Sequence, residues 1–261
     1  MVSDFKAGGF IVRSEAALLV IGDEILSGRT QEKNINFLAK SMTQKGIDLL
    51  EARVVSDKED HIIRAVDSLR LSYDYVFTSG GIGPTHDDIT ALSIAKAFAL
   101  PLIKHEDAFA KLDSYYSVRG IEFNKARQKM AYTPQGARLI DNPVSIAPGF
   151  IVENVYVLAG VPEIFQAMVE GVISQLAGGV ALQSATIATN LTEGDIAQEL
   201  AKLQLCYNTI SIGSYPHICQ SGLGLNIVLR GVDSILLANL VQEIETIIIA
   251  KDGAILPQKI C

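Results

Sequence analysis

TSGGIGPTHDD, residues 78–88, joins an apolar run to a helix-like run and decides how the chain folds. The run before it, YDYVF (73–77), is typical of a buried strand, and the run after it, ITALSIAKAFAL (89–100), carries apolar residues at helical spacing. Turns from a strand into a helix can carry glycine for purely steric reasons, or can use exposed N–H groups to bind a phosphate. The stretch therefore predicts either a tight turn or an anion-binding loop, and its spacing alone leaves both open.

The same strand-then-helix pattern precedes the loop twice. Strands are expected over 16–22 (AALLVIG) and 47–55 (IDLLEARVV), followed by helices over 31–45 and 58–70. Such a βαβαβα order predicts a three-layer α/β domain with a mostly parallel sheet and helices on both faces. The same sheet is expected to gain a strand over 154–160 (NVYVLAG), followed by one more helix.

Two further regions complete the predicted organisation. A helix is expected over 105–118, followed by a proline-punctuated stretch read as turns, and GGVALQ (178–183) is typical of a domain boundary. Beyond it the pattern predicts a small α+β domain of order βαββα. We therefore expect an N-terminal extension (1–14), the large domain (15–178) and the small domain (183–261).

The amino-acid composition argues against several classes of protein. Hydrophobic residues make up 49% of the 261 residues, the net charge is −7 and the pI is about 5.1, which argues against a nucleic-acid-binding surface. No run of about 20 uncharged apolar residues predicts a membrane span, and no secretory signal is apparent, so a cytoplasmic location is expected. The three cysteines are odd in number and lack CxxC spacing, which disfavours disulfides and structural zinc.

Three polar segments follow the first three predicted strands: GDEILSG, SDKED and TSGGIGPTHDD. Because ligands of parallel sheets bind outside the carboxyl ends of the strands, these segments are expected to meet at one edge. Gly80, Gly81 and Gly83 would let the backbone turn and present its N–H groups to an anion.

Carboxylates beside such a loop would repel a phosphate unless a divalent cation lay between them. Asp87 is read first as the N-cap of the helix beginning at Ile89, and Asp88 remains as a candidate metal ligand. His86 is either a proton carrier or an exposed loop residue. The motifs of acyl transfer and of zinc hydrolases are absent from the sequence.

IGDEILSG, SGGIGPTHDDIT, NPVSIAPGF and AGVP, in this order, resemble the molybdopterin-binding-like domain of CinA-type competence/damage-inducible proteins. The GPTHDD form also resembles the equivalent domain of eukaryotic FAD synthases, and IGSYP and VLRGVD are similar to the small domain that accompanies it. The resemblance implies the αβα fold of MoaB/Mog proteins. By motif position it matches their two functional aspartates to Asp57 and Asp88.

The resemblance implies metal-dependent cleavage of the pyrophosphate of ADP-ribose or FAD, with release of AMP. Molybdopterin binding with adenylyl transfer, and nucleotide binding without catalysis, remain alternatives. Mg²⁺, Mn²⁺ or Co²⁺ is the expected cofactor, molybdopterin is a possible ligand, and self-association is expected. The chain departs from the family pattern at Ser145, Ile146 and Ala159, where a changed ligand mouth is expected.

The candidate site residues fall into three groups. The catalytic candidates are Asp57, Asp88 and His86; the metal-binding candidates are Asp23, Glu24, Asp87 and Asp88; and the phosphate- or nucleotide-binding candidates are Ser79, Gly80, Gly81, Gly83, Thr85, Asn142, Pro148 and Gly149.

Overall fold

The computed structural model describes residues 13–219 and 222–257, so most of the predicted N-terminal extension lies outside the described residues. The chain divides into two compact units, with the division after Gly179.

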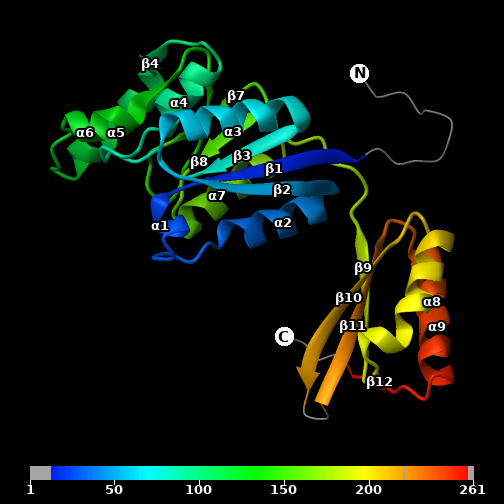
Figure 1. Cartoon of the computed structure of the whole chain (residues 1–261). Helices are drawn as coiled ribbons and strands as arrows, with labels where there is room; N and C mark the ends of the chain where they lie inside the picture. The colour runs from blue at the N-terminus through cyan, green and yellow to red at the C-terminus, as the bar shows by residue number, and fades with distance from the viewer. Residues whose placement is uncertain (1–12, 220–221, 258–261) are drawn as a thin grey trace, which may run out of the picture. The chain divides into compact units, whose positions relative to one another are not determined.

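The first unit is built on a six-stranded sheet of order β2-β1-β3-β8-β7-β6 (Figure 1). The first four strands are parallel, as predicted, and β7 and β6 extend the sheet in antiparallel pairing. The strands span Ser14–Ile21 (β1), Ile47–Val55 (β2), Tyr75–Ser79 (β3), Arg138–Ile140 (β6), Gly149–Val152 (β7) and Val155–Leu158 (β8).

Helices cover both faces of this sheet, which confirms the three-layer arrangement (Figure 1). Helices α2 and α7 lie on one face and α3 and α4 on the other, while α5 and α6 lie beyond the end of the sheet at which α1 begins. The helices span Asp23–Leu26 (α1), Asn34–Lys45 (α2), Glu59–Ser72 (α3), Thr90–Ala97 (α4), Glu106–Val118 (α5), Lys125–Gln128 (α6) and Pro162–Ile173 (α7).

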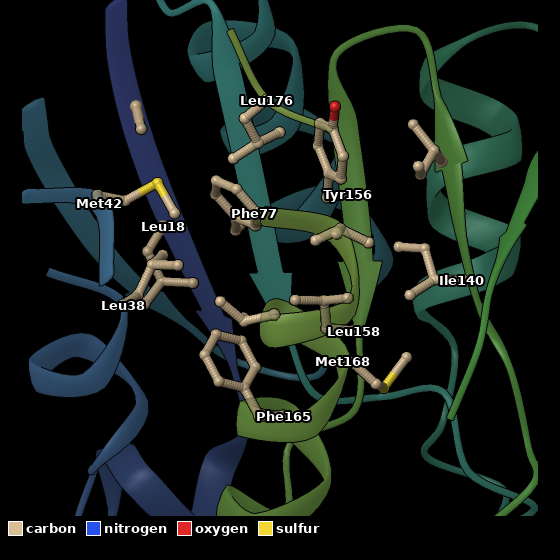
Figure 2. Close-up of a cluster of buried hydrophobic side chains, with 14 of the residues drawn as sticks. Leu18, Leu38, Met42, Phe77, Ile140, Tyr156, Leu158, Phe165, Met168 and Leu176 are labelled. Carbon is tan, nitrogen blue, oxygen red and sulfur yellow. The ribbon is translucent and has the colours of Figure 1, made fainter. Parts of the chain in front are cut away.

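The continuous apolar run of β1 serves two cores, because successive side chains of a strand point to opposite faces. Ala16, Leu18 and Val20 pack with α2 and α7, and the intervening residues pack with α3 and α4. Figure 2 shows the first core, in which Leu18 and Phe77 of the sheet lie among side chains of both covering helices. A strand buried on both faces must be apolar throughout, which explains why AALLVIG shows no alternation.

The region between α4 and β8 was predicted least well. The proline-punctuated stretch, residues 133–150, was expected to form turns, but it contains β6 and the beginning of β7 of the large sheet and part of a separate two-stranded sheet. These strands are hard to predict because they are only three or four residues long and prolines lie between them. The small sheet pairs β4 (Leu102–Lys104) with β5 (Tyr132–Pro134), and a 3₁₀ turn η1 (Lys129–Ala131) precedes β5.

The second unit has the predicted βαββα order, with one short strand added. Its antiparallel sheet has the order β10-β11-β9-β12, and its two helices contribute to a single apolar cluster with the sheet. Within the described residues, no helix is long and apolar enough to cross a membrane. The elements span Gln183–Thr189 (β9), Glu193–Cys206 (α8), Ser211–Cys219 (β10), Gly222–Gly231 (β11), Ser234–Ala250 (α9) and Ile255–Leu256 (β12).

Candidate functional site

A cleft of about 540 Å³ opens at the carboxyl ends of four parallel strands of the first unit. Its lining includes Ile21 at the end of β1, Asp57 after β2, Gly80–Gly83 after β3 and Gly160 after β8. The volume lies within the range of about 300–1,000 Å³ that is typical of small-molecule sites. This cleft, called the acidic cleft below, is where the topology of a parallel sheet predicts a ligand.

The segment Gly80–Gly83, called the glycine loop below, has three glycines that lie too close to their neighbours to carry a side chain. Gly80 and Gly81 have φ of 111° and 69°, which disfavour a side chain. A Cβ on Gly81 would also lie 2.1 Å from the hydroxyl of Thr90, and a Cβ on Gly83 would lie 2.7 Å from a carboxylate oxygen of Asp88. Steric crowding and backbone conformation therefore explain why these positions are glycine. The same loop can also bind a ligand through its N–H groups.

The loop also leaves donors for a ligand. Gly80 N–H bonds the carbonyl of Leu158, but in the described parts of the chain the amide hydrogens of Gly81, Ile82 and Gly83 donate no hydrogen bond. Unpaired N–H groups at the mouth of a cleft favour an anion, since an oxyanion can accept several of them at once.

A hydrogen bond accepted by Asp57 links the segment that follows β2 to the segment that follows β1. One of its carboxylate oxygens accepts a hydrogen bond of 2.8 Å from the backbone N–H of Asp23. Burial raises the pKa of Asp57 above its ordinary value of 3.8, and repulsion from Glu24, Asp23 and Asp87 adds to the shift. A half-buried carboxylate among like charges is suited to accepting a proton or to binding a cation.

Asp87 and Asp88 are organised by Thr85. The Thr85 hydroxyl lies 2.6 Å from one oxygen of Asp87 and 2.5 Å from one of Asp88, and the Thr85 N–H donates to Asp88 at 2.8 Å. The bond from Thr85 lowers the pKa of Asp87, assisted by His86 and Lys129. The N-cap prediction for Asp87 was wrong: helix α4 begins at Thr90 after Ile89, with no side-chain cap. The aspartates instead hold the turn that precedes the helix.

Four carboxylates thus line one cleft: Glu24, Asp57, Asp87 and Asp88. In the described residues no three of the His, Cys, Asp and Glu side chains are close enough to form a preassembled metal cluster. This excludes a closed site of the structural zinc type from the described residues.

The lining of the acidic cleft also has an apolar part. Tyr116 of α5 and Met130 of η1 contribute to it, together with Ile164 at the start of α7. Tyr116 stacks on Phe123 at 5.5 Å between ring centroids, and the guanidinium of Arg127 lies 5.1 Å from the Tyr116 ring. The sequence did not point to Tyr116 or Met130, because they come from the irregular region whose position at the sheet edge is set only by the fold.

One cation is anchored to the loop that carries the aspartates. Nζ of Lys129 donates a hydrogen bond of 2.6 Å to the backbone carbonyl of Thr85. An ammonium has three donors, so Lys129 keeps hydrogen-bonding capacity for an anion. Lys125, which lies on the preceding turn, lines the same side of the glycine loop.

The remaining predicted site residues are dispersed. Ser79 is buried beneath the loop, where its hydroxyl accepts a 2.8 Å hydrogen bond from Asn34. The His86 side chain is 98% exposed, and neither it nor Asp23 lines the acidic cleft. Asn142 does line the cleft, but its amide is fully used within the turn up to Ala147.

The segment that departs from the family pattern lies at the cleft mouth. Ser145, Ala147 and Ala159 line the cleft. Ile146 has φ of 66°, a left-handed conformation in which a β-branched residue is strained. Pro148 lines the adjoining cavity, whereas Gly149 is buried in β7, where a Cβ would lie 2.3 Å from the carbonyl oxygen of Val157.

Comparison with known proteins agrees with this architecture. Residues 17–178 match the family described as "Probable molybdopterin binding domain", and residues 181–251 match "FAD synthase, middle domain". A probable FAD synthase of Caenorhabditis briggsae is 34% identical over 79% of this chain and 44% of its own length. A CinA-like protein of Sulfurihydrogenibium is 34% identical over 59% of this chain and 40% of its own. The chain thus spans less than half of either relative.

A solved structure supports the same fold for the first unit. The CinA protein of Thermoplasma acidophilum, described as being of unknown function, aligns with a TM-score of 0.59 and 35% identity. The alignment covers 62% of this chain and 97% of that protein. The predicted resemblance is confirmed, and the chain belongs to the molybdopterin-binding-like domain family that includes CinA-like proteins.

Proposed function

We propose that the acidic cleft hydrolyses the pyrophosphate of a nucleoside diphosphate-linked compound, such as ADP-ribose or FAD, with a divalent metal ion and release of AMP. The observation that carries this proposal is the position of four carboxylates and three unpaired loop amides around one cleft. Amides alone would suit any anion. Carboxylates facing the same space suit an anion only when a cation accompanies it.

The glycine loop would hold the phosphates. The N–H groups of Gly81, Ile82 and Gly83 would bind phosphate oxygens, and Lys129 would add positive charge from its anchored position at Thr85. Asp87 and Asp88, which share the Thr85 hydroxyl, would hold the metal ion, and water and the phosphates would complete its shell. A bound Mg²⁺ or Mn²⁺ would supply charge neutralisation at the phosphates and a lowered pKa for an attacking water.

Asp57 would accept the proton of that water. Its raised pKa makes it a stronger base than an ordinary aspartate, and its bond to the Asp23 amide fixes its direction. As the water oxygen bonds to phosphorus, the bond from that phosphorus to the bridging oxygen breaks. The products are AMP and the other phosphate monoester.

The experiment that tests this proposal is a substrate panel. The protein would be incubated with ADP-ribose, FAD, NAD or ATP, each with Mg²⁺, Mn²⁺, Co²⁺ or EDTA, and AMP would be quantified. Release of AMP from ADP-ribose or FAD that requires metal is expected. Absence of AMP with every combination would contradict the proposal.

A second candidate is molybdopterin binding with adenylyl transfer, favoured by the family matched over residues 17–178. The same loop and carboxylates would then bind ATP or a pterin phosphate. Growth of a deletion strain on a nutrient that requires a molybdoenzyme separates the two candidates, because only this second function makes growth depend on the protein.

A further inference from the structure

A second cavity of about 380 Å³ adjoins the acidic cleft. Both cavities are lined by Gly81, Ile82, Gly83, Asp88 and Met130, so the glycine loop forms their common wall. We call the second cavity the loop pocket. A ligand whose phosphates bind the glycine loop therefore has the acidic cleft on one side of the loop and the loop pocket on the other.

The loop pocket is mostly apolar. Leu92 of α4 and Tyr132 of β5 line it while remaining 37% and 39% exposed, and Phe150 and Leu102 complete the apolar wall. Apolar side chains left open in a cavity gain free energy when a flat ring covers them, at roughly 25 cal/mol per Å². A sugar would place hydroxyl groups against this wall, where the apolar side chains offer them no hydrogen-bond partner.

Charge differs between the two sides of the loop. Glu24, Asp57 and Asp87 line the acidic cleft but not the loop pocket, and Lys125 and Lys129 line the loop pocket but not the acidic cleft. A pyrophosphate on the glycine loop would therefore lie between ammonium groups on one side and the carboxylate-bound metal on the other. The loop pocket therefore lies on the side of the loop that carries the lysines, while Asp88 borders both cavities.

We infer that the loop pocket binds a second flat heteroaromatic ring, so that the preferred ligand is a dinucleotide with one ring on each side of its pyrophosphate. The first ring lies in the acidic cleft against Tyr116, and the second covers Leu92 and Tyr132. This inference rests on the proposed position of the pyrophosphate at the glycine loop. It predicts that FAD, which has two rings, binds more tightly than ADP-ribose, which has one ring and a sugar.

The test compares the affinities of FAD and ADP-ribose by isothermal titration with Ca²⁺, a divalent ion that carboxylates and phosphates both bind, under conditions in which no AMP is released. The variants are Leu92→Asp in the loop pocket and Leu71→Asp as a control, since Leu71 is 79% exposed and lines neither cavity. Leu92→Asp is expected to weaken FAD binding at least about tenfold, because the lost apolar contact and the new charge both oppose the ring. ADP-ribose binding is expected to change less than about twofold, and Leu71→Asp to change neither affinity.

Equal weakening of both ligands by Leu92→Asp, or no weakening of either, would overturn the inference. Tyr132→Ala provides a second variant in case Leu92→Asp does not fold. Because binding is measured without turnover, its outcome is separate from catalysis. Selective loss of FAD binding in a protein that hydrolyses nothing would support the loop pocket and reject the proposed hydrolase.

Discussion

The carboxylate of Asp57 lies 2.8 Å from the backbone nitrogen of Asp23 and accepts its hydrogen. This bond connects the end of β2 to the start of α1, and it places a half-buried carboxylate beside Glu24 and Asp87. The bond favours the ionised form, but burial and the neighbouring charges outweigh it, and the pKa of Asp57 rises.

The raised pKa of Asp57 predicts how stability depends on pH. Between the ordinary pKa of 3.8 and the higher folded pKa, the folded protein binds more protons than the unfolded chain. Stability attributable to Asp57 therefore falls as pH rises through this window, and the loss persists at neutral pH. Asp57→Asn keeps an acceptor for the Asp23 amide, so the variant in EDTA is expected to be more stable than the wild type at pH 7.

Urea unfolding in EDTA at acidic and neutral pH measures this difference. Asp60→Asn serves as the control, because Asp60 is an exposed partner of Arg64 and its loss should matter little. A less stable Asp57→Asn protein at pH 7 would show that the carboxylate is stabilising as an anion, contrary to the raised pKa.

Thr85→Val tests how the acidic loop is organised. Valine has nearly the shape of threonine but lacks the hydroxyl that lies against Asp87 and Asp88. The pKa of Asp87, lowered chiefly by this hydroxyl, is expected to rise toward 3.8. Carboxyl ¹³C NMR titration would measure the shift, and Thr43→Val, which removes a hydroxyl bonded within α2, should leave Asp87 unchanged.

Gly81→Ala tests the close approach of the glycine loop to Thr90. Gly81 and Gly28 have nearly equal φ, 69° and 72°, but only Gly81 has a neighbour within reach of a Cβ. Both substitutions should cost about 1 kcal/mol from the left-handed backbone. Gly81→Ala should cost a further 1–3 kcal/mol or so, because an overpacked site must shift. Equal losses for the two variants in urea unfolding would show that the loop accommodates the methyl group.

The regular half of the fold could be predicted from periodicity. The runs at β1 and β3 are buried on both faces, the run at β2 forms a partly exposed edge strand, and Gly46 ends α2 in the left-handed conformation expected of it. Strands β6 and β7 could not be predicted, since three or four residues between proline-containing segments carry too little pattern.

Only those residues of the candidate site that closely follow the ends of strands could be predicted from the sequence. Glu24, Asp57 and Asp88 were found because parallel strands bring their carboxyl ends together. Tyr116 and Lys129 lie 28 or more residues beyond Asp88, and only the packing of α5 and η1 brings them back to the loop. The spacing of residues in the sequence therefore could not predict that Tyr116 and Lys129 lie beside the loop.

The second unit allows a test of local stability in helix α8. Thr192 and Asp195 form a capping box, in which the Asp195 carboxylate accepts the Thr192 N–H at 2.8 Å. Thr192→Ala should destabilise this unit by about 1 kcal/mol. Thr246→Ala, on an exposed turn of α9, should be nearly neutral, because its hydroxyl bonds only a carbonyl one turn earlier. Thermal unfolding followed by circular dichroism would compare them, and a neutral Thr192→Ala would show that the cap contributes nothing.

The rate of AMP release from FAD or ADP-ribose by the Asp88→Asn protein tests the central claim most directly. With saturating Mn²⁺ and wild-type circular dichroism, we predict a loss of about 100-fold or more, which corresponds to roughly 3 kcal/mol of transition-state stabilisation. Asp113→Asn, at an exposed position of α5, should retain the wild-type rate. A folded Asp88→Asn protein that kept full metal-dependent turnover would contradict the assignment of the acidic cleft as the catalytic site.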